Sequence, residues 1–172
     1  MKKFSTVICA VLVLATFAFF ALGSGNDKNS VSSGEGDSAA KTTEGSATLT
    51  ANVGDVLTTE SVKITYVSCD EYKGYSEYTK PKDGNTIYKL SFSVENTGTS
   101  DRFVSSLDFK CYADNTAADD YIYADDILSA TVSAGRSAKG SVYFEVPKSA
   151  EKVEVEYETD FWTSGKAIFV VK

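Results

Sequence analysis

Apolar and polar residues alternate with a period of two along several short stretches after residue 47. This alternation is typical of strands that bury one face, and no part of this region shows a helical period. The apolar positions of the five clearest stretches are Val62, Ile64 and Tyr66; Tyr88, Leu90, Phe92 and Val94; Leu107, Phe109 and Cys111; Val142, Phe144 and Val146; and Val153, Val155 and Tyr157.

Residues 127–132 and 166–171 are two further candidate strands. Turn-forming residues separate the stretches, in the segments 83–85, 96–98, 134–136 and 147–148. Short strands at this spacing indicate an all-β protein, and we expect residues 47–172 to form one antiparallel β-sandwich of about seven to eight strands.

Residues 1–23 have the composition of an export segment. Lys2 and Lys3 precede an apolar run from Val7 to Leu22, and small residues follow at its end. Two alternatives remain open. The segment is either a signal peptide cleaved after Gly23 or an uncleaved N-terminal membrane anchor, since the run is just short of a comfortable span.

Residues 24–46 consist mainly of Gly, Ser, Thr and charged residues, with Val31 as the one large apolar side chain. A segment of this composition buries too little apolar surface to offset the entropy of ordering. We therefore expect a flexible Gly/Ser/acidic linker between the export segment and the sandwich.

The net charge and the absence of His argue against two classes of function, nucleic-acid binding and His-dependent catalysis. A net charge of −7 repels phosphate backbones, which excludes nucleic acid as a partner. The chain has no His, so the usual general base and the Ser-His and Cys-His nucleophile pairs are absent. We expect no enzymatic activity and no cofactor.

Cys69 and Cys111 lie in the expected domain and can pair in an oxidising compartment. The alternation of side chains along the strands argues against this disulfide. If Val62, Ile64 and Tyr66 face the core, Cys69 faces outward, whereas Cys111 faces inward. A bulge after Tyr66 would reverse the phase. A disulfide and two separate buried thiols are both open.

The order of several short motifs resembles an Ig-like domain of unknown function found in Gram-positive lipoproteins, grouped with the mycobacterial immunoprotective extracellular protein. The resemblance covers residues 53–172 and implies an Ig-like β-sandwich, secreted or tethered to the surface, with no catalytic residues. The chain departs from the lipoprotein pattern at Ser24, which stands where a lipid-modified Cys would lie. The motifs are V-G-D at 53–55, E-N-T-G at 95–98, S-S-L-D-F at 105–109 and G-S-V-Y-F-E-V-P at 140–147.

A tyrosine-rich segment at residues 71–81 is the first candidate binding site. Tyr72, Tyr75 and Tyr78 recur every third residue among Gly, Ser and charged residues. Tyrosine offers a large rigid face and a hydroxyl at low entropic cost, as in recognition loops. The alternative is that these rings pack against the domain's own surface.

An acidic stretch is the candidate metal site, with Asp119, Asp120, Asp125 and Asp126. Calcium requires six or more oxygen ligands, which a loop rich in Asp can supply. The spacing lacks the regularity of an EF-hand loop, and a solvated loop between strands is the alternative.

Together these features predict a non-enzymatic binding module at the cell surface or outside a Gram-positive-type bacterium. Its partner would be a protein or cell-envelope component, contacted through loops at one end of the sandwich. Contact with a membrane would occur only through residues 1–23 if these are not cleaved. The alternative function is a structural or accessory spacer in a cell-envelope complex.

Overall fold

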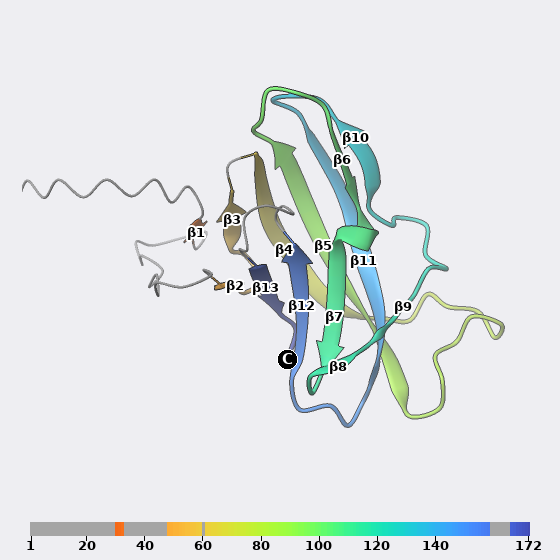
Figure 1. Ribbon diagram of the computed structural model, residues 1–172. Coiled ribbons are helices and arrows are strands. Elements are labelled where there is room, and N and C mark those ends of the chain that lie inside the picture. Colours follow the sequence, from red (N-terminus) through yellow and green to blue (C-terminus); the bar gives the residue numbers. More distant parts are fainter. Residues whose placement is uncertain (1–29, 33–47, 60, 159–165) are drawn as a thin grey trace, which may run out of the picture.

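The computed structural model describes residues 30–32, 48–59, 61–158 and 166–172 (Figure 1). In these ranges it contains thirteen strands and one short 3₁₀ turn. The elements in chain order are β1 (Ser30–Ser32), β2 (Thr48–Ala51), β3 (Val56–Thr58), β4 (Val62–Tyr72), β5 (Asn85–Asn96), β6 (Arg102–Ser105), η1 (Ser106–Asp108), β7 (Phe109–Ala113), β8 (Thr116–Ala117), β9 (Asp119–Asp120), β10 (Ser129–Val132), β11 (Ser137–Pro147), β12 (Val153–Glu158) and β13 (Lys166–Val170).

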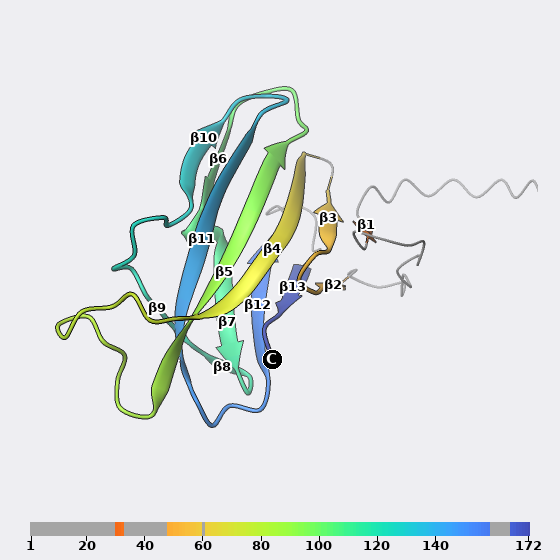
Figure 2. The same ribbon diagram turned by 180° about the vertical axis from the view of Figure 1, so that it is seen from behind.

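Two sheets pack face to face as a β-sandwich, which confirms the predicted fold class. One sheet has the strand order β1-β3-β4-β5-β11-β9 and the other β2-β13-β12-β7-β8, while β6 and β10 form a separate pair. Every pairing among the described strands is antiparallel except that of β2 with β13. Figures 1 and 2 show β4, β5 and β11 as one layer and β7, β12 and β13 as the other. The strands beyond the expected seven or eight are two to four residues long.

Aromatic rings from both sheets fill the centre of the core. Phe92 of β5 lies 4.9 Å from Phe109 of β7 and 4.8 Å from Phe169 of β13, measured between ring centroids. Tyr66 of β4 stacks on Phe92, and its hydroxyl donates to the carbonyl of Val170 at 3.1 Å. Burial raises the pKa of Tyr66, so the hydroxyl remains a donor at any physiological pH. Tyr66, Phe92 and Phe109 occupy inward positions of the predicted alternation.

A β-bulge between Tyr66 and Ser68 changes the phase of β4. The shift moves Cys69 to the inner face, where it packs against the core cluster that contains the buried Cys111. The structure thus removes the phase objection to a disulfide, yet it holds both residues as free thiols. Burial raises the pKa of Cys69 and raises that of Cys111 to about 12. A bond between them stays a prediction.

Two positions do not follow the predicted alternation. Leu107 was expected on an inward strand position but lies in η1 with 77% of its surface exposed. The cause is a capping box, in which Ser105 accepts from the N–H of Leu107 and Asp108 accepts from the N–H of Ser105. Strand β7 therefore begins only at Phe109. Tyr143 was expected on an exposed outer position but is only 3% exposed.

Three residues of the expected linker, Ser30–Ser32, form β1 and pair with β3. The rest of segment 24–46 and the export segment 1–23 lie outside the described residues. In the part of the chain that the structure describes, no helix is long and apolar enough to cross a membrane.

Candidate functional site

The structure separates the three tyrosines predicted as a binding site. Tyr78 is 99% exposed and Tyr75 is 38% exposed, both in the loop between β4 and β5. Tyr72 turns back onto the domain, and its hydroxyl donates to the carbonyl of Gly74 at 3.0 Å. The alternative of packing on the domain's own surface thus describes Tyr72, whereas Tyr75 and Tyr78 lie open to solvent.

Tyr72 belongs to a second, smaller core on the outer face of the six-stranded sheet. Its ring centroid lies 5.0 Å from that of Tyr143 and 5.8 Å from that of Tyr121. We call these three residues the tyrosine cluster; Ile87 packs within it. The cluster explains why Tyr143 is buried at a strand position that the alternation assigns to the outside.

Residues 121–128, which we call the covering segment, close this second core. The segment leaves β9 at Tyr121, whose N–H donates to the carbonyl of Tyr143 at 2.9 Å. It rejoins β11 at Leu128, whose N–H donates to the carbonyl of Ser141 at 2.9 Å. Because both ends are bonded to β11, the residues between them are held close to the sheet. Figures 1 and 2 place this segment and the β4–β5 loop on the same flank of the sandwich.

Asp126 fixes the covering segment to the sheet through its carboxylate. It accepts hydrogen bonds from Lys89 at 2.8 Å, from Ser141 at 3.0 Å and from the hydroxyl of Tyr143. Partial burial alone would raise the pKa of Asp126, but these three donors outweigh it and lower the pKa to about 2. Lys89 also lies 5.6 Å from the ring centroid of Tyr143. The carboxylate is therefore ionised at neutral pH, and both of its oxygens accept hydrogen bonds from the sheet.

Tyr121 differs from Tyr143 in the state of its hydroxyl. Only 5% of Tyr121 is exposed, and its hydroxyl is the one buried side-chain oxygen or nitrogen in the described residues that lacks a hydrogen-bond partner. A buried hydroxyl without a partner carries the full cost of losing water. The cluster thus contains two tyrosines whose hydroxyls have partners, Tyr72 and Tyr143, and one, Tyr121, whose hydroxyl has none in the described residues.

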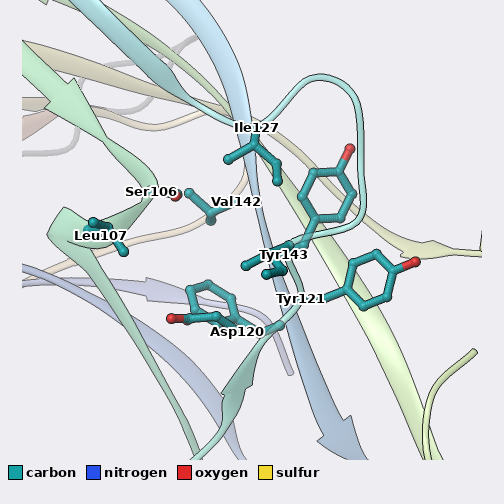
Figure 3. Close-up of a pocket in the computed structure, with 9 residues that line it drawn as sticks. Ser106, Leu107, Asp120, Tyr121, Ile127, Val142 and Tyr143 are labelled. Carbon is teal, nitrogen blue, oxygen red and sulfur yellow. The ribbon is translucent and has the colours of Figure 1, made fainter. Parts of the chain in front are cut away.

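A cavity of about 30 Å³ opens beside the cluster, between η1, β11 and the covering segment. Figure 3 shows Leu107 on one side of this cavity and Tyr121 and Tyr143 on the other, with Val142 and Asp120 between them. The lining also includes Ile122. Of the two apolar side chains at its rim, Ile122 is 67% exposed and Leu107 is 77% exposed. The neighbouring Tyr123 is 64% exposed. Two large exposed apolar side chains therefore line one small cavity, and Tyr123 lies next to them, with its ring centroid 5.5 Å from that of the lining residue Tyr121.

The four aspartates of the predicted metal site serve different structural roles. Asp119 pairs with Lys82 at 2.6 Å, and Asp126 binds the groups described above. Asp120 lines the cavity; partial burial and the adjacent Asp119 raise its pKa. Asp125 is exposed. No group of three Cys, Asp or Glu side chains in the described residues is arranged to hold a metal ion, so calcium binding stays a prediction.

A second hollow, of about 340 Å³, is lined by residues of the β7–β8 hairpin, of β9 and of the loop that follows β11. Its carboxylates are already engaged. Asp114 accepts from the N–H groups of Glu151 and Lys152, and Glu145 accepts from the N–H of Lys82 and from the side chain of Asn85. The hollow presents no large apolar or aromatic side chain, which makes it the weaker candidate for a partner interface.

The sequence interpretation missed Leu107, Tyr121, Ile122 and Tyr123. Leu107 was assigned to the core because it fits the alternation. The signal for the other three was present, because Y-I-Y at 121–123 is an apolar triplet within an acidic stretch. In the structure Tyr121 of this triplet is buried, and Ile122 and Tyr123 are exposed, as apolar side chains at interaction surfaces are.

Comparisons with known proteins agree with the resemblance predicted from the motifs. Residues 51–168 match the family described as domain of unknown function DUF4352. The chain is 30% identical over 109 residues to the uncharacterized lipoprotein YcdA of Bacillus subtilis strain 168, and the match covers 61% of this chain. It covers only 30% of YcdA, so most of that relative has no counterpart in the match.

Solved structures confirm the fold. The crystal structure of YcdA gives a TM-score of 0.52 at 21% identity, covering 64% of this chain and 36% of that one. MPT63, a secreted protein of Mycobacterium tuberculosis, gives 0.53 at 12% identity, covering 73% and 99%. A β-sandwich protein of Clostridium difficile 630 gives 0.50 at 11% identity, covering 77% and 100%. None of these names assigns a reaction.

Proposed function

Because the chain belongs to the DUF4352 family, whose function is unknown, we propose a function from the geometry of its own site. It is a non-enzymatic binding module outside the cytoplasm that contacts a protein through the flank around the small cavity. The observation that carries this proposal is the exposure of Leu107 and Ile122 on the lining of one cavity, with the exposed Tyr123 packed beside Tyr121 of the same lining. Large apolar side chains gathered in this way are characteristic of interaction surfaces.

The bonds that hold the covering segment to the sheet also fix the positions of its exposed side chains, which favours binding. Ile122 and Tyr123 lie in a covering segment bonded to β11 at both ends and through Asp126. Little conformational entropy remains to be lost there on binding, so more of the contact energy appears as affinity. A cavity of about 30 Å³ has room for the tip of one apolar side chain, the kind of anchor found at interface hot spots.

The negative charge around the cavity indicates which residue types the partner would present there. Asp120 lines the cavity and Asp125 lies just beyond Tyr123, on a chain of net charge −7. A partner that inserts an apolar side chain here would be favoured by a Lys or Arg beside it. We therefore propose a protein partner with an apolar anchor next to a basic residue, rather than an anionic envelope polymer.

The absence of His from the sequence supports a non-enzymatic role, and so does the engagement of Asp126 by three donors. For location, we propose export through residues 1–23 in a Gram-positive-type bacterium. The two relatives named above as a lipoprotein and a secreted protein support this. Retention of residues 1–23 would anchor the domain at the membrane.

Site-specific photo-crosslinking in native cells tests the proposal. A photoreactive residue at position 123 should give a protein adduct, and the same residue at Val53, exposed to a similar extent at 52%, should not. Leu107→Ser and Ile122→Ser should each abolish the adduct, whereas Phe103→Ser, another exposed apolar position at 61%, should leave it intact. Equal adducts at positions 123 and 53, or an adduct insensitive to Leu107→Ser, would contradict the proposal and favour the spacer alternative.

A further inference from the structure

We propose that the outer edge of β3 is a strand-addition site, and that the chain's own residues Ser30–Ser32 occupy it as a releasable latch. In the structure these residues form β1, which pairs with β3 in antiparallel register, Ser30 with Thr58, Val31 with Leu57 and Ser32 with Val56. Figure 1 shows β1 at the margin of the six-stranded sheet, beside β3. This inference is independent of the cavity on the opposite edge of that sheet.

The acceptor edge is firmly built. Leu57 is fully buried in the main core, and β3 continues into a tight hairpin with β4. The N–H of Thr59 donates to the carbonyl of Val62 at 2.8 Å, and the Thr59 side chain bonds the same residue at 3.1 Å. A preformed strand with one free edge readily pairs with another extended segment.

The occupant is held much less firmly. Its pairing with the domain spans only three residues, and two of those are serines, which have weak strand preference. Val31 is the one large apolar residue between positions 24 and 46, and it lies opposite the buried Leu57. Short segments with few hydrogen bonds open locally far more often than core strands. Docking of β1 is therefore reversible while the hairpin it docks on stays folded.

The latch decides whether the edge of β3 is available. When docked, it covers an edge that would otherwise be open to pairing with another chain. When released, it leaves that edge of β3 free for strand addition.

Hydrogen–deuterium exchange on the full chain, recovered as the cell processes it, tests this. Amides of residues 30–32 should exchange at least about tenfold more slowly than those of 33–47, and at least about a hundredfold faster than those of β5. Val31→Pro, which removes an N–H and the strand conformation, should erase that protection and accelerate exchange in Val56–Thr58. Ala39→Pro, a proline elsewhere in the same segment, should change neither.

Each other outcome overturns the inference. Exchange of 30–32 at the rate of its neighbours would mean that no latch forms. Protection equal to that of β5 would mean a permanent strand. Protection that grows with protein concentration would mean that the edge is filled by a second copy. Because β5 exchange is read in the same experiment, a Val31→Pro protein that fails to fold is recognised at once.

Discussion

Tyr121 and Tyr143 provide a sharp test of the tyrosine cluster, because they differ in one respect. Both are buried, their ring centroids lie 6.3 Å apart, and both pack against Tyr72. The hydroxyl of Tyr143 donates to Asp126, whereas that of Tyr121 has no partner in the described residues. Replacing each by Phe keeps the ring and removes only the hydroxyl.

The expected effects have opposite signs. A hydrogen bond to a charged group contributes about 1.5–3 kcal/mol. The Asp126 side chain is 52% exposed, so water competes for it, and we expect Tyr143→Phe to cost about 1–1.5 kcal/mol. An unsatisfied buried hydroxyl costs about 1–3 kcal/mol, so Tyr121→Phe should stabilise the protein by about 1 kcal/mol.

Urea unfolding measures both free energies by linear extrapolation, provided that the denaturant slope is unchanged. For a domain of this size, 1 kcal/mol corresponds to roughly 3–5 °C in the melting temperature. A double-mutant cycle of Tyr143→Phe with Asp126→Asn should give a coupling of at least about 0.5 kcal/mol. The same cycle with Tyr121→Phe should give none.

An equal loss of stability in the two single variants would refute this reasoning. It would mean that the Tyr121 hydroxyl has a partner in solution, or that removing a hydroxyl weakens the packing of either ring. A Tyr143→Phe variant as stable as the parent would instead show that Asp126 does not hold the covering segment through this bond.

Three further predictions concern other parts of the domain. Because the folded state lowers the pKa of Asp126 from 3.8 to about 2, its contribution to stability is complete above pH 3.8 and is lost as the pH falls toward 2. The difference in melting temperature between the parent and Asp126→Asn should therefore shrink as the pH falls toward 2. Gly140→Ala should lower the free energy of unfolding by at least about 2 kcal/mol, because the added Cβ would lie 2.7 Å from the backbone of Leu128. Urea unfolding measures this loss, and an unchanged midpoint would contradict the close packing at Gly140. Cys69 and Cys111 should resist a thiol reagent in the native protein and both react, by peptide mapping, after denaturation without reductant. Failure to react after denaturation would reveal a disulfide.

The sandwich could be predicted because its main strands bury one face each. Phe92, Phe109 and Val155 lie at inward positions that the two-residue alternation assigns correctly. The same rule fails at Leu107, where a local capping box overrides the strand pattern. The sequence named a bulge after Tyr66 only as the condition for an inward Cys69, and the structure places a bulge there. Alternation could not decide whether it forms, because an extra residue leaves no mark in a run of alternating side chains.

The candidate site was harder to predict, since it depends on contacts between distant segments. Tyr72 is separated from Tyr143 by most of the domain's length, and alternation places Tyr143 outside. The two rings meet because β4 and β11 both pair with β5, and only the course of the covering segment adds Tyr121 to them. Periodicity carries no information about such a segment, because it is neither strand nor helix.

The covering segment links the stability of the second core to the exposed flank. Ile122 and Tyr123 cannot keep their positions if the segment leaves the sheet, because they lie between its two attachments to β11. Weakening the Asp126 anchor should therefore reduce the photo-crosslink at position 123 without changing any side chain that touches the partner. Tyr121→Phe should leave that crosslink intact, because it removes no bond of the segment. Loss of the crosslink in Asp126→Asn together with its retention in Tyr121→Phe would locate recognition in the held geometry of the segment rather than in the tyrosine hydroxyls.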